Sequence, residues 1–145
     1  MIALGADHAG FQFKENIKIL LSSMAIPWKD FGTSSDASVD YPDFAHAVSN
    51  AVAAGEAEYG ILVCGTGIGM SIVANKHKGI RAASVESVEA ARLSRQHNNA
   101  NVLTLGARLI PWDRAEHIIR VFLSAEFEGG RHERRVGKIH TLTNL

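Results

Sequence analysis

The chain has 145 residues, of which 46% are hydrophobic and 21% charged, a balance typical of a soluble globular protein with one core. Its 15 basic and 15 acidic side chains cancel, so the net charge gives no support for a nucleic-acid or membrane partner. The single cysteine, Cys64, cannot form an internal disulfide and fits a reducing compartment. We expect one domain over residues 1–145 in the cytoplasm, because neither a signal peptide nor an apolar run of membrane length occurs.

Apolar runs and helical periods alternate along the chain. The runs predict five strands, at Ile2–Ala6, Ile26–Phe31, Tyr59–Cys64, Ile80–Ser84 and Val102–Gly106. Between them we expect a helix around Phe13–Met24, one from Pro42 to Gly55, one after residue 69, and then Ser87–Asn98, Pro111–Ser124 and a short helix from Gly130. Five successive β-α units predict an α/β fold, a three-layer αβα sandwich with a five-stranded parallel sheet, Rossmann-like in class.

Polar side chains follow three of the predicted strands. Asp7 and His8 come after the first strand, Cys64 ends the third, and Arg108 lies just past the fifth. Ligands of parallel sheets bind beyond the carboxyl ends of the strands. The sequence therefore predicts a site at this edge of the sheet.

The stretch Gly65-Thr66-Gly67-Ile68-Gly69 joins the third strand to a helix. Its glycines permit positive φ and close approach of a ligand, and N–H groups at a helix start favour an anion. The alternative is a tight connection with nothing bound. The spacing GxGxG differs from the dinucleotide pattern GxGxxG, and no Gly-Lys-Ser/Thr follows, which argues against both common nucleotide loops.

Cys64 has two interpretations. A free cysteine is often a small buried hydrophobe, but a thiol beside a helix N-terminus has a lowered pKa and can act as a nucleophile or base. Likewise His97 could merely cap its helix, and Arg131 and Arg135 could form a solvated helical face or a phosphate clamp. Neither HExxH nor CxxC occurs, so a metal has little support.

Several motifs in order resemble the B-type ribose-5-phosphate isomerase family, which includes the galactose-6-phosphate isomerase subunits. They are GADHAGF, DYPDFA, CGTGIGMSIVANK, GIRAA, LSRQHNNANVLTLGAR and FEGGRHERRV, and they cover nearly the whole chain. The resemblance implies interconversion of ribose 5-phosphate and ribulose 5-phosphate through an enediolate, with no metal or organic cofactor. It also implies a homodimer with sites at the interface, with a tetramer left open.

The resemblance further implies roles for individual residues. Cys64 aligns with the base that moves a proton between C1 and C2, His97 with the residue that helps to open the furanose ring, and Thr66 adds a hydroxyl donor. The expected substrate contacts are Asp7, His8, Tyr41, Gly65, Gly67, Ile68, Gly69, Asn98, Arg108, Arg131 and Arg135, the arginines holding the phosphate. Met70 stands where some relatives carry a glutamate, so this chain looks like the cysteine type.

Two other functions compete with this one. An isomerase of a hexose 6-phosphate, of the allose or galactose type, needs only a modestly longer pocket. A non-catalytic module that binds a sugar phosphate or nucleotide would use the same turn without turnover.

Overall fold

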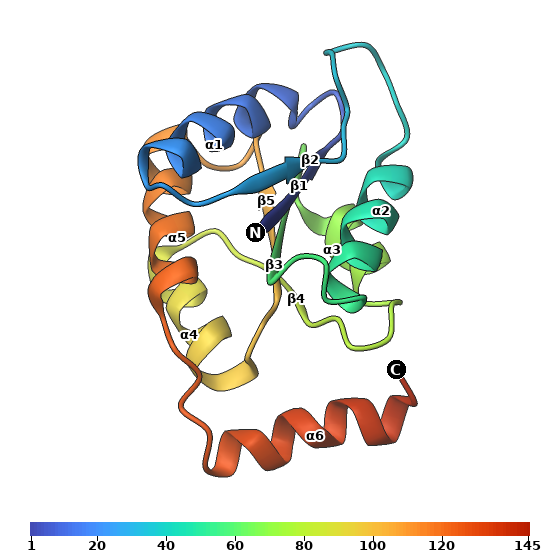
Figure 1. Ribbon diagram of the computed structural model, residues 1–145, viewed down its shortest axis with the longest axis vertical. Helices are drawn as coiled ribbons and strands as arrows, with labels where there is room; N and C mark the ends of the chain where they lie inside the picture. The colour runs from blue at the N-terminus through green and yellow to red at the C-terminus, as the bar shows by residue number, and fades with distance from the viewer.

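The computed structural model describes residues 1–145 and contains one parallel five-stranded sheet in the order β2-β1-β3-β5-β4, with helices on both faces (Figure 1). The strands are β1 (Ile2–Ala6), β2 (Trp28–Asp30), β3 (Tyr59–Cys64), β4 (Ala82–Ser84) and β5 (Val102–Gly106). The helices are α1 (Phe11–Ser23), α2 (Tyr41–Ala53), α3 (Ile68–Ala74), α4 (Val88–Asn98), α5 (Trp112–Ser124) and α6 (Arg131–Thr143). The predicted three-layer α/β sandwich is confirmed. None of the helices combines the length and hydropathy that a membrane span needs.

The three central strands are buried on both faces, which is why they read as continuous apolar runs. Successive side chains of a strand point to opposite faces, so Ile61 joins the core under α1, α4 and α5, while Leu62 joins the core under α2 and α3. Phe122 of α5 and Val48 of α2 are fully buried in these two cores. The sheet is therefore rigid. The residues that follow β1, β3 and β5 lie together at the carboxyl ends of the strands, which we call the carboxyl edge of the sheet.

The chain reverses its direction across the sheet next to β1. It moves from β1 to β2 on one side and then returns to β3 on the other, with α1 and α2 covering opposite faces. Such a topological switch point leaves a crevice beyond the carboxyl ends of the two strands. Asp7 directly follows β1 and Cys64 ends β3, and the Asp7 N–H donates to Val63 O at 3.2 Å.

The predicted elements that differ most in length from the structure are β2, β4 and α6. β2 and β4 have three residues each, fewer than expected, because each is an edge strand that pairs on one side only. The last helix is not short: α6 has 13 residues and lies across the end of the molecule opposite the α2 N-terminus (Figure 1). Most of α6 is exposed, and its apolar side chains have few partners within the chain.

Candidate active site

Cys64 occupies the carboxyl end of β3 with its side chain buried. The Gly67 N–H donates to its Sγ atom at 3.1 Å. Gly67 has φ +77°, and a Cβ atom there would lie 2.9 Å from the Leu105 carbonyl carbon, so glycine is required for this turn. A backbone donor aimed at the sulfur stabilises negative charge on it, which suits a thiol that works as a base.

The glycine turn is open on the side where a ligand would approach. The N–H groups of Gly65, Thr66 and Gly69 have no acceptor within the chain. Thr66 Oγ1 accepts from the Ile68 N–H at 3.2 Å, which leaves the hydroxyl hydrogen available to a ligand. The turn can therefore offer several donors to one anion.

Two side chains lie directly against this turn. A Cβ atom at Gly65 would lie 3.1 Å from Nη1 of Arg108, and one at Gly69 would lie 2.7 Å from the ring of Tyr41. Arg108 is fixed here because its N–H donates to Gly65 O at 2.9 Å. A cation and an aromatic ring thus flank the donors, and the guanidinium suits a ligand that carries a phosphate.

The end of β1 supplies Asp7 and His8 to the same edge. Asp7 is buried, and its Oδ1 accepts from the N–H groups of Ala9 and Gly10 at 2.9 and 3.1 Å, while Oδ2 accepts nothing from the chain. His8 Nδ1 accepts from the Val39 N–H at 3.2 Å, which places the proton of a neutral ring on Nε2. Asp7 Oδ2 can accept from a sugar hydroxyl, and His8 Nε2 can donate to an oxygen.

Four predicted site residues lie at the opposite edge of the sheet. His97 and Asn98 end α4, just before β5, and Arg131 and Arg135 belong to α6, beneath that edge in Figure 1. Val102 pairs with Gly60, whereas Cys64 pairs with Gly106, so about 13 Å of strand separates the two edges. Within one chain, His97 and Cys64 cannot touch the same sugar.

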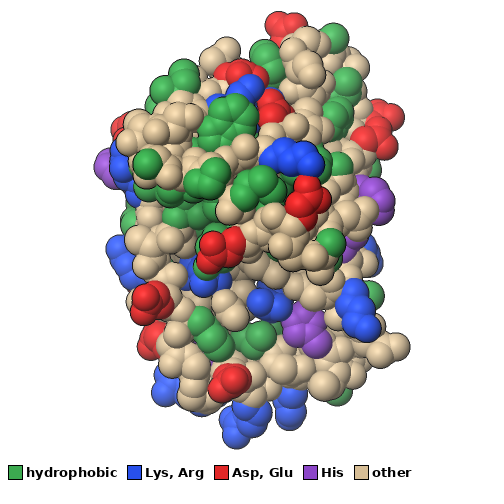
Figure 2. Space-filling model, in the orientation of Figure 1, with side chains coloured by type: hydrophobic (Ala, Val, Ile, Leu, Met, Phe, Trp, Pro, Cys, Tyr) green, Lys and Arg blue, Asp and Glu red, His purple; other side chains and the backbone are tan.

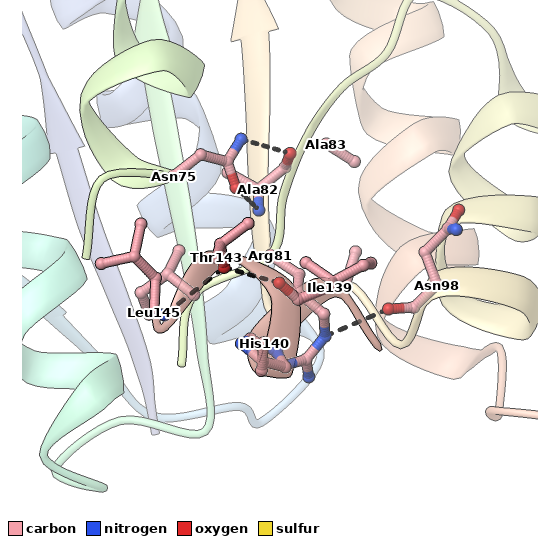
Figure 3. A pocket seen from close by; sticks show the side chains of 11 residues that line it. Asn75, Arg81, Ala82, Ala83, Asn98, Ile139, His140, Thr143 and Leu145 are labelled. Atoms are coloured by element: carbon pink, nitrogen blue, oxygen red, sulfur yellow. Dashed lines mark hydrogen bonds between the residues drawn. The ribbon is translucent and has the colours of Figure 1, made fainter. Parts of the chain in front are cut away.

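The opposite edge of the sheet, where α4 ends and α6 lies, is held by hydrogen bonds from Arg81. Arg81 Nε donates to the carbonyl oxygen of Asn98 at 3.1 Å (Figure 3). It also donates to the carbonyl oxygen of Asn99 at 3.0 Å, and the two bonds hold the end of α4 in place. Burial lowers the pKa of Arg81, and the nearby Arg95 adds to this. A cavity of about 340 Å³ lies between α6 and β4, with Arg81, Asn98 and His140 in its wall. None of the cavities of the single chain is lined by Cys64.

Basic side chains gather along this lower edge, over α6 (Figure 2). Arg131 and Arg135 are exposed and share one helical face, as the spacing predicted. They are free to bind a phosphate because no salt bridge occupies either of them.

His97 has two neighbours that the sequence did not single out. Its Nε2 lies 3.4 Å from Oε1 of Glu128, and its ring stacks on that of His132 with centroids 4.3 Å apart and planes 8° apart. The ligating atoms of these three residues lie within 4.8 Å of one another. Imidazole binds a metal in its ring plane, and two parallel stacked rings do not share one, so this arrangement fits stacking better than coordination. Both neighbours belong to the motif FEGGRHERRV, in which only the arginines were predicted as site residues.

Comparisons with known proteins agree with this geometry. The family model for ribose/galactose isomerases matches residues 2–139. The ribose-5-phosphate isomerase B of Escherichia coli is 47% identical over 138 residues, which cover 95% of this chain and 93% of that protein. The solved Clostridium thermocellum ribose-5-phosphate isomerase B has 48% identity and a TM-score of 0.97, covering 99% of this chain and 97% of that one. The Mycoplasma genitalium enzyme, solved with bound ribulose 5-phosphate, has 43% identity and a TM-score of 0.94, covering 99% and 95%.

Proposed function

We propose, because this chain belongs to the ribose/galactose isomerase family, that it is an aldose–ketose isomerase that interconverts ribose 5-phosphate and ribulose 5-phosphate. The observation that carries the proposal is the Cys64 sulfur, held by the Gly67 N–H beside a turn of unpaired backbone donors. The ribulose 5-phosphate bound to the Mycoplasma genitalium relative supports the choice of a pentose phosphate.

The reaction moves one proton and creates one transient negative charge. The Cys64 thiolate removes the proton from C2 of the open-chain aldose, and the C–H electron pair forms the C1–C2 double bond while the carbonyl π pair moves to O1. The proton then returns to C1, and the O2 hydroxyl loses its proton as the C2 ketone forms and O1 gains one. No oxidant is consumed, since C1 is reduced and C2 oxidised within one molecule.

The turn from Gly65 to Gly69 suits the intermediate of this reaction. Each free N–H that meets the enediolate oxygen contributes about 3 kcal/mol of transition-state stabilisation in comparable oxyanion sites. A base close to the substrate contributes about 10²- to 10⁴-fold. Arginines on the phosphate fix the sugar without touching the reacting carbons.

A second copy of this chain completes the site in our proposal. Cys64, Asp7 and Arg108 lie at one edge of the sheet, and His97, Asn98, Arg131 and Arg135 at the other, so a twofold pair brings the two sets together in two equivalent sites. Exposed apolar side chains stand next to both sets: Ile68 and Ile72 on α3 are 55% and 57% exposed, and Leu142 on α6 is 81% exposed. Burying these side chains against the partner would stabilise such a dimer.

The function is tested by proton NMR of ribose 5-phosphate with the protein in D₂O. We expect ribulose 5-phosphate to appear and deuterium to enter the recovered sugar, and we expect Cys64→Ser to lose both while it still binds the sugar phosphate by calorimetry. Allose 6-phosphate and galactose 6-phosphate run in parallel identify a hexose preference. Absence of product and of exchange with every sugar would refute the isomerase, and full exchange by Cys64→Ser would refute the thiolate base.

A further inference from the structure

We infer that Glu128 and His132 are positioning residues for His97, one holding a ring nitrogen and the other a ring face, so that Nδ1 is the nitrogen presented to the sugar. The inference rests on the proposed function, in which His97 helps to open the furanose ring. Neither residue is among the site residues predicted from the sequence, and neither has to touch the substrate in this role.

Glu128 reaches His97 from the segment that links α5 to α6. Its carboxylate Oε1 lies 3.4 Å from Nε2 of His97, slightly beyond hydrogen-bonding distance, and we infer that this contact tightens when the substrate binds. The backbone is already in place, because the Glu128 N–H donates to Gln96 O at 3.0 Å. A carboxylate at Nε2 holds the proton on that nitrogen and leaves Nδ1 free, as in other oriented histidines.

His132 contacts the flat face of the His97 ring, whereas Glu128 lies near a nitrogen at its rim. It is 8% exposed and stacks flat on His97. Burial lowers the pKa of His132, and the nearby His97 and Arg131 add to this. The flat ring packs against the face of His97 and so limits how that ring can turn. Its contribution is that of an aromatic surface.

The chain between these two residues is built for this arrangement. Gly129 and Gly130 have φ +68° and +55°, a conformation that glycine adopts at low cost. The reversal lets Glu128 contact His97 from one side and returns the chain so that α6 places His132 on the ring, with the His132 N–H donating to Gly129 O at 3.0 Å. The two glycines thus serve to reverse the chain so that both Glu128 and His132 reach His97, a role separate from phosphate binding by the arginines.

Ring opening requires a group that both accepts and donates a proton. The C1–O4 bond breaks with its electron pair going to O4, which takes up a proton, while the O1 hydroxyl gives up its proton as the C1 carbonyl forms. A histidine whose Nδ1 faces the sugar can pass the proton from one oxygen to the other. Glu128 stabilises the imidazolium between the two transfers, as the carboxylate of a catalytic triad does.

The experiment separates ring opening from isomerisation. Ribose 5-phosphate is compared with its 4-deoxy analogue, which lacks the hydroxyl that closes the furanose and is therefore always open. For Glu128→Gln and His132→Ala, as for His97→Asn, we expect kcat/KM to fall about tenfold or more on ribose 5-phosphate and less than about twofold on the analogue. His132→Phe, which keeps the flat ring, should retain most of the activity, and the exposed Glu126→Gln is the matched control.

A second readout needs no turnover. Nitrogen-15 NMR of the histidine rings should find the proton of neutral His97 on Nε2 in the wild type and mixed tautomers in Glu128→Gln. Equal losses on the closed and open substrates, or an unchanged tautomer in Glu128→Gln, would overturn the inference while leaving the isomerase intact. A wild type that turns over neither sugar but keeps the Nε2 tautomer would refute the proposed function instead.

Discussion

The Gly67 N–H donates to the Cys64 sulfur at 3.1 Å, and this contact joins the conformation of the glycine turn to the reactive atom. Gly67 can adopt its φ of +77° because glycine has no Cβ atom. For the same reason its backbone can lie directly against β5. A change in the conformation of the turn would therefore also change the hydrogen bond that the sulfur accepts.

Gly67→Ala should cost stability and most of the activity, whereas Gly79→Ala should cost little of either. The two glycines have nearly the same φ, +77° and +80°, but a Cβ atom at Gly79 meets nothing within 4 Å, while one at Gly67 meets the backbone of β5. We expect about 1 kcal/mol of lost unfolding free energy for Gly79→Ala and about 3 kcal/mol for Gly67→Ala, by urea denaturation. Equal losses in the two variants would show that crowding against β5 plays no part.

Arg135→Ala should weaken substrate binding far more than Arg134→Ala. Both arginines are exposed on α6 and lie about 100° apart around the helix. Arg135 lies about 40° from Arg131, and Arg134 lies about 60° from it on the other side. We expect KM for ribose 5-phosphate to rise about tenfold or more in Arg135→Ala, with a smaller change in kcat, because a charge-assisted phosphate contact is lost. Arg134→Ala should stay within about twofold in both constants. An unchanged KM in Arg135→Ala would remove it from the phosphate site.

Asp30 should make the stability of the protein sensitive to acid. Lys14, with 1% of its side chain exposed, lies 2.6 Å from Asp30 Oδ2, and Lys18 lies 3.0 Å from the same atom. Burial opposes ionisation, but hydrogen bonds from Lys14, Gly32 and Lys18 together lower the pKa of Asp30. A lowered folded pKa gives stability that is present above about pH 4 and lost as the pH falls through the folded value.

Asp30→Asn should therefore unfold more easily at pH 7, by roughly 1 to 3 kcal/mol, because the buried Lys14 then keeps only Glu15, at 3.3 Å, as a charged partner. Denaturation at pH 7 and pH 3 should find a smaller difference in this variant than in the wild type. Glu56→Gln, which breaks the exposed pair with Lys29, serves as the control and should change stability by less than about 0.5 kcal/mol. Identical pH dependence in Asp30→Asn and the wild type would contradict the assignment.

The sequence predicted the centre of the fold better than its edges. The bounds of β1, β3 and β5 agree with the structure because strands buried on both faces leave an unbroken apolar signal. β2 and β4 are shorter than predicted because neighbouring apolar residues, such as Ile26 and Ile80, pack in the cores without joining the sheet. The length of α6 was missed because most of its residues are polar and its apolar positions are few, Val136, Ile139 and Leu142 among them.

The site was predictable in part. Strand ends and glycines identified the edge with Asp7, Cys64 and Arg108, because the carboxyl ends of parallel strands meet. Periodicity alone did not reveal that His97 and Arg131 lie at the other edge, since it gives the face of a helix and not its neighbours. Glu128 and His132 were missed for the same reason: their role depends on a contact with α4 that only the folded chain shows.

The central claim, a site that joins Cys64 of one copy to His97 of another, is tested most directly by subunit complementation. Cys64→Ser and His97→Asn chains, each inactive or nearly so alone, are co-expressed with different tags and purified through both. One of the two sites in such a heterodimer then has both native residues, so we predict about half of the wild-type isomerase activity on ribose 5-phosphate. A purified heterodimer no more active than its parents would contradict the shared site.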